Sequence, residues 1–372
     1  MKLTIKRTPF VKILTKVEDG IPSKTADPNY LNFLITLNDE EQTIMSSDGA
    51  ITLCADLKGE EETIVSYENG CIEVPAKYLS DIIKQLDGEE VTLNQVENSV
   101  LNITDGISNF NINCINGDEY PTLDKNFEVK NSCSLSGIDF SNLFNTTAFA
   151  VATKGPKKCF YGVKVDFSPN LITFVATDSF RLAQKKIEIV NDQTFSFTAP
   201  VKALSLVNKY CETKPVKVSS NGSLAKFEVD GLTIICSLYN GDFPSLDRII
   251  PEITPYVLTV DSKSFLAALG RVTIVINSEK SPMVRLRCNE TQSELFARSE
   301  NVGNATETIK DAKFEGGSFE IGFNYNFVTD AIKALNSNTI TIAFAGESRA
   351  FLVKNEDPKT IQLITPIRTS SN

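Results

Sequence analysis

An amphipathic pattern recurs three times along the chain, about 124 residues apart. Apolar residues at positions i, i+1, i+4, i+5 and i+8 mark one face of a helix, because an α-helix turns once in 3.6 residues. The second copy has Asn208 in place of one apolar residue. The pattern predicts three similar units, and its members are Tyr78, Leu79, Ile82, Ile83 and Leu86, then Ala203, Leu204, Val207 and Cys211, then Phe327, Val328, Ala331, Ile332 and Leu335.

Each unit is predicted to contain two half-units, each a helix followed by strands. Pro75 and Pro200 suit the first turn of a helix, where a missing N–H costs nothing. Alternating apolar and polar residues between the helices predict strands, and hairpins make these strands antiparallel, with one sheet face covered by the helices. The expected helices lie near 7–17, 75–86, 137–151, 200–211, 262–276 and 324–335.

Short turn signals predict where the strands reverse. Asn221-Gly222 and Asp230-Gly231 each predict a two-residue hairpin turn between alternating runs. Thr104-Asp105-Gly106 predicts a turn at the place equivalent to Asp230-Gly231. Tyr120-Pro121 and Phe243-Pro244 close equivalent units, so we expect an α+β chain with domains at 1–125, 126–252 and 253–372.

Composition narrows the chemistry. The 372 residues are 41% hydrophobic and 23% charged, which is typical of a globular protein, and no run reaches the length of a membrane span. The lysine-interrupted N-terminus is unlike a signal peptide, so we expect a cytoplasmic protein. The eight cysteines form no CxxC pair and are expected to be buried thiols. With no histidine and no glycine-rich phosphate loop, neither a metal nor a cofactor is expected.

Positive charge is concentrated in the helical segments. Together these segments carry a charge of +9, for example +3 in 7–17 and +2 in 200–211. Because the net charge of the chain is −10, the remaining residues carry −19. Lys202 and Lys209 lie opposite the apolar stripe of their helix, and three of the counted lysines are concentrated in 153–158 beside a Gly-Pro turn. If these faces converge, they would attract phosphates without reading bases, although any single helix could simply be a solvated surface.

Motifs along the whole chain resemble one family, the bacterial sliding clamp or beta subunit of DNA polymerase III. The segment 176–183, ATDSFRLA, resembles the family's ATDGHRLA. The segment 241–251, GDFPSLDRIIP, resembles its xxxFPxxxRVLP, and 363–368, LITPIR, resembles its VVMPMR terminus. Val74-Pro75-Ala76-Lys77, Phe323-Asn324 and Lys333-Ala334-Leu335 match its helix motifs, in order and at family spacing.

The resemblance implies three clamp domains per chain, each with two helices packed on antiparallel sheets. Two chains would form a six-domain ring around double-stranded DNA, bound without sequence preference. The ring would tether DNA polymerase III without catalysing a reaction. The alpha subunit, the clamp loader and repair polymerases would dock through short linear peptides.

The resemblance also implies a peptide pocket. Ser179-Phe180 stands where the family has Gly-His, Thr365 replaces a methionine, and Phe160 replaces the usual leucine. These changes should alter peptide preference. The alternative for this cluster is interdomain packing. Its members are Phe160, Thr177, Ser179, Phe180, Arg181, Leu182, Pro244, Arg248, Ile249, Leu363, Thr365, Pro366, Ile367 and Arg368.

Two further surfaces follow from the charge sorting and the resemblance. Phe110, Val275 and Ile276 align with the chain-to-chain contact, and Lys24 and Lys154 occupy DNA-contact positions of the family. The expected DNA-facing set is Lys12, Lys16, Lys24, Lys77, Lys84, Lys154, Lys157, Lys158, Lys202, Lys209, Lys263 and Arg271.

Two alternatives remain open. A diverged clamp paralogue of a phage or plasmid replisome would keep the fold and change its partner peptides. An enzyme would use carboxylates such as Asp48 and Asp178, but these sit at analogous turns, which favours a structural role.

Overall fold

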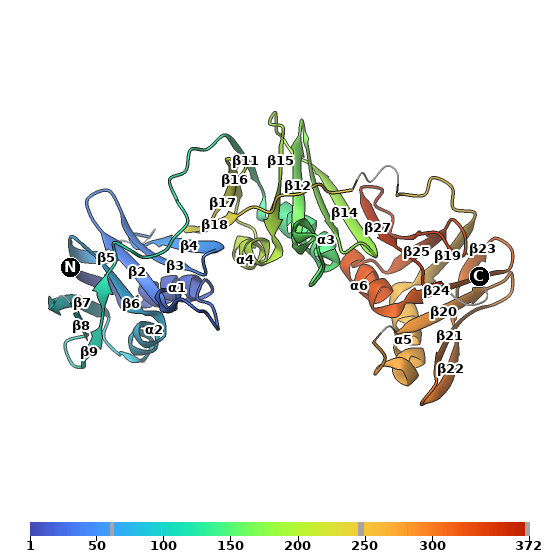
Figure 1. Cartoon of the computed structure of the whole chain (residues 1–372), viewed down its shortest axis with the longest axis horizontal. Coiled ribbons are helices and arrows are strands. Elements are labelled where there is room, and N and C mark those ends of the chain that lie inside the picture. Colours follow the sequence, from blue (N-terminus) through green and yellow to red (C-terminus); the bar gives the residue numbers. More distant parts are fainter. Residues whose placement is uncertain (60–62, 98, 245–248, 281, 369–372) are drawn as a thin grey trace. The chain divides into compact units, whose positions relative to one another are not determined.

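The computed structural model describes residues 1–59, 63–97, 99–244, 249–280 and 282–368. All six predicted helices are present (Figure 1). The third and fifth are shorter than predicted, because the chain tightens into 3₁₀ turns at η2 (Ala148–Ala150) and η5 (Thr273–Ile276). None of the helices in the described residues has the length and apolarity that a membrane crossing requires. The helices are α1 (Arg7–Glu18), α2 (Ala76–Gln85), α3 (Gly137–Thr147), α4 (Val201–Cys211), α5 (Ser262–Val272) and α6 (Tyr325–Leu335).

Each helix follows one strand and precedes three, and the described residues contain six such β-α-β-β-β half-units. This confirms the predicted half-units. Around α1 and α2 the strands are β1 (Lys2–Lys6), β2 (Asn32–Leu37), β3 (Gln42–Ser47), β4 (Ile51–Asp56), β6 (Gly70–Pro75), β7 (Glu90–Glu97), β8 (Val100–Thr104) and β9 (Asn109–Asn113).

Around α3 and α4 they are β11 (Asn131–Leu135), β12 (Gly162–Ser168), β13 (Leu171–Thr177), β14 (Arg181–Glu188), β15 (Phe195–Pro200), β16 (Val216–Ser220), β17 (Leu224–Val229) and β18 (Leu232–Ser237). Around α5 and α6 they are β19 (Tyr256–Asp261), β20 (Met283–Cys288), β21 (Ser293–Ser299), β22 (Gly303–Thr308), β24 (Phe319–Asn324), β25 (Thr339–Phe344), β26 (Phe351–Lys354) and β27 (Thr360–Ile364). Short additions lie outside this plan: β5 (Ile64–Glu68), β10 (Ile115–Asn116), β23 (Lys313–Glu315), η1 (Pro28–Leu31) and η3 (Lys158–Tyr161).

Paired half-units exchange their first strands. β1 pairs with β7 of the second half-unit, and β6 pairs back with β2 of the first. The same exchange joins β11 to β16, β15 to β12, β19 to β25 and β24 to β20, always antiparallel. Two half-units therefore form each domain together. The helix stripes predict the same organisation, in which three similar units each contain two half-units.

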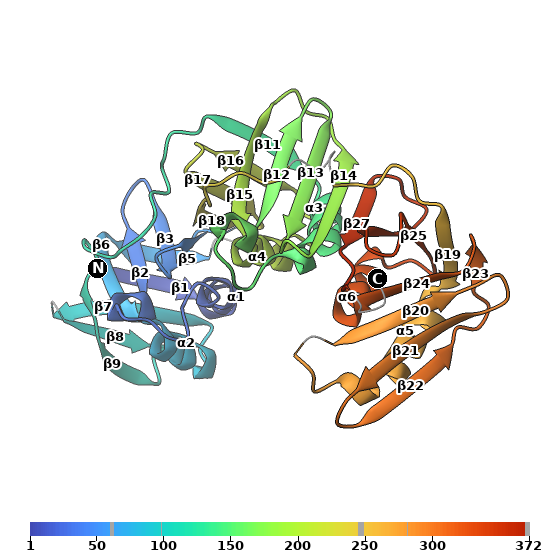
Figure 2. The ribbon, with the colours of Figure 1, turned by 45° about the vertical axis from the view of Figure 1, so that its right-hand side comes forward.

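The chain divides into two compact units, one formed by 1–140 and 202–238, the other by 141–201 and 239–372. In the first unit, β4 pairs with β18 from Ala55 opposite Leu232 to Ile51 opposite Cys236, within a nine-stranded sheet. In the second unit, β14 pairs with β27 in the same way, and Figure 2 shows these two strands. The expected middle domain, 126–252, thus contributes strands to both units, and its boundaries stay a prediction.

Most of the predicted stripes are buried. Leu79 and Ile83 of α2 and Val328 and Ile332 of α6 have no more than 2% of their surface exposed. The prediction is wrong for Tyr78, which is 63% exposed because it lies at the margin of the buried arc. The two prolines also differ from the prediction. Pro75 and Pro200 end strands β6 and β15, and the helices begin at the following residue.

Four turns share one geometry. In each, a Ser or Thr hydroxyl donates to the carbonyl four residues later, and the next Asp or Asn accepts two backbone N–H groups. The third residue has positive φ. The turns begin at Ser47-Asp48-Gly49, Thr104-Asp105-Gly106, Thr177-Asp178-Ser179 and Ser220-Asn221-Gly222.

One turn prediction is confirmed and two are corrected, those for Asn221-Gly222 and for Thr104-Asp105-Gly106. Val229 pairs directly with Leu232, so Asp230-Gly231 is the expected two-residue turn. Ser220 pairs with Ala225, so the Asn221-Gly222 turn is longer than two residues. Asp105 begins a four-residue turn, which is equivalent to Asp230 in position but not in form.

The cysteines are reduced thiols, as predicted. Seven are buried, and Cys71 is half-buried. Burial raises the pKa of the Cys54 thiol to about 11 and that of Cys236 to about 12, which suppresses the reactive thiolate near neutral pH.

We expect a maleimide to modify Cys71 before any other cysteine of the native chain, and slowly, because burial raises the pKa of its thiol too. Peptide mass mapping after timed quenching checks this, with the chain unfolded in guanidinium as the control in which all eight react. Native labelling of Cys236 as fast as Cys71 would contradict the described burial.

Candidate functional site

The turn between β13 and β14 lies at the centre of the segment 176–183 that resembles the clamp family. Asp178 accepts hydrogen bonds from the backbone N–H groups of Phe180 and Arg181, each at 2.9 Å. Ser179 sits at φ +80°, a conformation that the matching turns give to glycine. Phe180 is consequently held with 61% of its surface exposed. Because turn N–H groups occupy Asp48 and Asp178 alike, their role as turn acids is favoured over a catalytic one.

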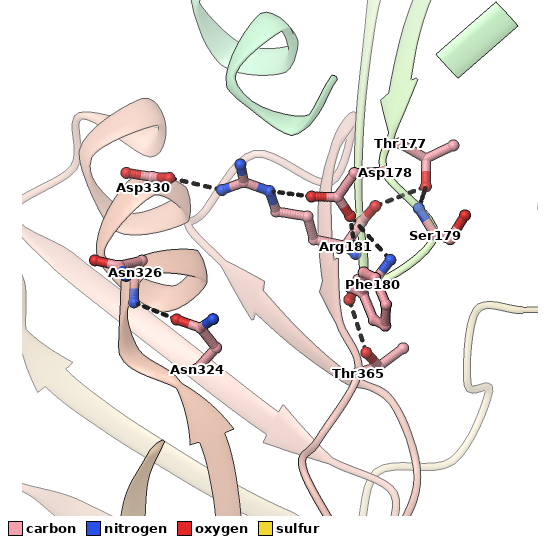
Figure 3. Close-up of polar contacts among 9 residues, drawn as sticks. All are labelled: Thr177, Asp178, Ser179, Phe180, Arg181, Asn324, Asn326, Asp330 and Thr365. Carbon is pink, nitrogen blue, oxygen red and sulfur yellow. Dashed lines mark hydrogen bonds and ion pairs between the residues drawn. The ribbon is translucent and has the colours of Figure 1, made fainter. Parts of the chain in front are cut away.

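Arg181 is fully engaged within the chain. Its Nε donates to Asp178 at 3.0 Å and its Nη1 donates to Asp330 of α6 at 2.6 Å, as Figure 3 shows. The guanidinium carbon lies 4.7 Å from the ring centre of Phe327 and 5.3 Å from that of Phe149. Only 13% of the side chain is exposed. Arg181 therefore fastens the turn to α6, and the peptide-binding role expected of it stays a prediction.

A cleft of about 620 Å³ opens beside this turn, entirely within the second unit. The segment after β27 forms one side, where both the N–H and the hydroxyl of Thr365 donate to the Phe180 carbonyl, at 2.8 and 2.9 Å (Figure 3). Its walls combine aromatic and aliphatic groups with two lysines. The lining residues are Val151, Ala152, Thr153, Lys154, Asp178, Phe180, Arg181, Lys280, Asn324, Phe327, Thr365, Pro366 and Ile367.

The predicted pocket residues are divided among several places. The cleft is lined by five of them: Phe180, Arg181, Thr365, Pro366 and Ile367. Thr177 and Ser179 shape its turn. Leu182 and Leu363 are each 3% exposed and belong to a buried cluster with Val175, none of whose members lines the cleft. Their burial favours the alternative of interdomain packing for these two residues.

The remaining pocket residues lie outside the cleft lining. Phe160 is 6% exposed and packs edge-on against Phe243, with ring centres 5.5 Å apart. Pro244 lines a second, smaller cleft of about 370 Å³ over β12, β13 and β14. Ile249 and Arg368 are exposed, and Arg248 lies outside the described residues.

The sequence motifs did not point to several residues of the cleft. Phe327 was expected in the core, but it is half-buried and lines the cleft. Its position at the edge of the helix stripe was the only feature of the sequence that indicated partial exposure. Lys154 lines the cleft as well, whereas the sequence suggested for it only a DNA-facing role, which stays a prediction. Nothing in the sequence around Lys280 indicated a site, because the fold brings it there from the segment before β20.

The expected DNA-facing cations are of two kinds. Five form ion pairs within the chain: Lys16 with Asp230, Lys84 with Glu18, Lys202 with Asp48, Lys209 with Asp19, and Arg271 with Glu307. The other seven form no such pair in the part of the chain that the structure describes: Lys12, Lys24, Lys77, Lys154, Lys157, Lys158 and Lys263.

The expected chain-to-chain residues lie on or beside the strands that end two sheets. Phe110 is on β9, which ends a five-stranded sheet, and 40% of it is exposed. Val275 lies in η5, which packs near β22, the end of a four-stranded sheet. Ile276 is completely buried, so its side chain offers no contact surface, whereas Ile274 is 67% exposed. The structure therefore favours Ile274 over Ile276 as a contact.

Replacing Ser179 by glycine should raise the free energy of unfolding by about 1 kcal/mol, because glycine adopts positive φ without the Cβ penalty. The matched control is Gly222→Ser, at φ +92° where an added Cβ would meet only open space, and it should lower the free energy of unfolding by a similar amount. Urea titration measures both. A destabilising Ser179→Gly would show that the serine side chain matters more than the backbone strain.

Comparison with known proteins places this chain in a family. Family models of the DNA polymerase III beta subunit match 1–124 for its N-terminal domain, 134–245 for its central domain and 247–368 for its C-terminal domain. The beta sliding clamps of Staphylococcus epidermidis and Staphylococcus aureus are 30% identical to it, over 99% of this chain and their full length.

Solved structures agree with this assignment. The DNA polymerase sliding clamp of Bacillus subtilis matches with a TM-score of 0.92 at 26% identity, covering 99% of each chain. The beta subunit of Streptococcus pyogenes matches with a TM-score of 0.91 at 25% identity, covering 99% of this chain and 100% of the other. The chain therefore belongs to the DNA polymerase III beta subunit family, the bacterial sliding clamps.

Proposed function

We propose that two copies of this chain close into a six-domain ring that encircles duplex DNA and tethers a replicative polymerase. The observation that carries the proposal is the use of strand edges. β4 joins β18 and β14 joins β27, each linking half-units of neighbouring domains. By the same rule β22 would join β9, yet each of these strands is the last in its own sheet. A second copy can supply both missing partners, since an exposed edge is a template for pairing.

The internal ladders also predict the register of this contact. The first residues of β18 and β27, Leu232 and Thr360, pair with Ala55 and Lys185. Thr52 is the first residue of β4 that pairs across the β3–β4 hairpin, and Leu182 has the same place in the β13–β14 hairpin. Ala55 and Lys185 each lie three residues after it. In β22 the equivalent residue is Gly303. Asn109 of one copy should therefore face Thr306 of the other, and Asn111 should face Asn304.

The variant Asn111→Cys, Asn304→Cys should form covalent dimers under mild oxidation, because directly opposed strand residues suit disulfide geometry. Oxidation in the presence of circular plasmid should leave protein on the DNA through a high-salt wash, and linearising the plasmid should release it.

The control pair is Asn111→Cys, Thr308→Cys, which is about 13 Å out of register at about 3.3 Å per residue and should not cross-link. Equal cross-linking of both pairs would argue against the register. Covalent dimers that are lost equally from circular and linear plasmid would argue against encirclement.

DNA would be held by diffuse contact with lysines on the helices. These contacts are suited to sliding, because exposed cations attract any phosphate and are screened by salt. At some of these lysines, a carboxylate of the same chain weakens the attraction for DNA phosphates. Lys202 lies 2.5 Å from Asp48 and Lys209 lies 2.6 Å from Asp19, so a phosphate must compete with an acid there.

Replacing Lys12 or Lys77 by glutamine should lower DNA affinity and reduce the slope of log affinity against log salt by about 0.9 each, the value of one phosphate contact. Lys202→Gln should have a smaller effect, and Asp48→Asn, which keeps the turn, should strengthen binding. Fluorescence anisotropy with a labelled duplex at several salt concentrations measures all four. Identical effects of Lys202→Gln and Lys12→Gln would contradict the role given to the ion pairs.

The cleft beside Phe180 is the proposed docking site for partner proteins. Apolar walls formed by Phe180, Phe327 and Ile367 suit the large side chains of a short extended peptide. The partners would be the polymerase alpha subunit, the clamp loader and repair polymerases, and the site of action the cytoplasm. Tethering uses no catalytic group.

A second candidate is a clamp that serves a phage or plasmid replisome. Phe180 and Thr365 favour it, since both lie in the cleft at positions where this chain departs from the family pattern. Binding of peptides from chromosomal replication proteins would favour the first role, and selective binding of peptides from a mobile replisome would favour the second.

A further inference from the structure

The charge of the cleft is set by four side chains, Asp178, Arg181, Lys154 and Lys280. Arg181 binds two carboxylates, those of Asp178 and Asp330, so its charge is more than balanced within the chain. Its guanidinium also lies against the rings of Phe149 and Phe327, which further restricts access to it. Arg181 is therefore a positioning residue for the turn and for the aromatic wall, and a bound ligand would find it occupied.

Lys154 and Lys280 differ from Arg181. Both are exposed, and neither forms an ion pair with any of the residues that the structure describes. They reach the cleft from separate segments, Lys154 from the loop after η2 and Lys280 from the loop before β20. The apolar part of the lining includes Val151, Phe180, Phe327, Pro366 and Ile367. An apolar cleft edged by two unneutralised cations is complementary to an apolar segment that carries a negative charge.

We propose that this cleft selects peptides that carry a carboxylate beside their apolar anchors, and that Lys154 and Lys280 are the residues that make this selection. The inference rests on the proposed peptide docking and names its chemical class. The carboxylate can come from an acidic side chain or from a peptide C-terminus. Because both lysines are exposed, each should contribute about a two- to fivefold gain in affinity, and the gain should shrink as salt rises.

The test uses three fluorescent pentapeptides that differ only in charge, measured by polarisation against the full chain. The neutral reference is Ala-Leu-Gln-Leu-Phe with a C-terminal amide. One acidic arm replaces glutamine by glutamate, and the other keeps glutamine with a free C-terminal carboxylate. Each is measured with the unmodified chain and with Lys154→Gln, Lys280→Gln and the double variant. Lys310→Gln, an exposed lysine outside the cleft lining, is the matched control.

We expect the neutral peptide to bind all variants alike, because it does not use the lysines. At least one acidic peptide should bind the unmodified chain more tightly than the neutral peptide, and the double variant should abolish that gain while Lys310→Gln keeps it. The arm that shows the gain identifies the source of the carboxylate.

Equal binding of neutral and acidic peptides to the unmodified chain would overturn the inference and leave peptide docking intact. A gain that survives in the double variant would also overturn it. If Lys154→Gln and Lys280→Gln weaken DNA binding and leave peptide discrimination unchanged, the lysines serve DNA and the inference is wrong. Failure of all three peptides to bind would overturn peptide docking itself, and this inference with it.

Discussion

Backbone hydrogen bonding between strand edges is the interaction on which the rest of the structure depends. A β-α-β-β-β half-unit cannot complete its own sheet, because its first strand belongs to the sheet of its neighbour. The last strand then joins another domain, as β4 joins β18 and β14 joins β27. Such pairing satisfies backbone groups that would otherwise template aggregation. Among the last strands of the six half-units that the structure describes, β9 and β22 are the two without such a partner, and a second copy can supply both by the same rule.

The sequence was sufficient to predict the elements. The repeated stripe predicted three helices, since a packed helix needs a buried face wherever it lies, and the half-unit pattern predicted the other three. Asp230-Gly231 predicted its turn correctly, because positive φ at two successive residues strongly favours this dipeptide. The Asn221-Gly222 loop was longer than predicted, because the Ser220 hydroxyl and the Asn221 side chain supply hydrogen bonds that stabilise a wider turn. Strand exchange between half-units could not be read from the pattern, which records which face is buried and not which edge is paired.

The site was predicted only in part, and for a physical reason. Local motifs identified the turn around Phe180 and the segment around Pro366. The role of Arg181 depends on Asp330, which lies 149 residues away in the sequence, so its ion pair is a property of the fold. The apolar residues of the motif are divided between the cleft lining and a buried cluster, as Ile367 and Leu363 illustrate. The motif does not distinguish the two kinds of residue, because its spacing does not show which side chains the fold buries.

The central claim is that two open edges bind a second copy of the chain. Light scattering across micromolar to nanomolar concentrations tests it most directly. The account predicts a mass of twice 40.9 kDa that persists on dilution, as a ring with two identical contacts requires. A mass of 40.9 kDa at every concentration would contradict it, since β9 and β22 would then remain unpaired and the chain could not hold DNA by enclosing it.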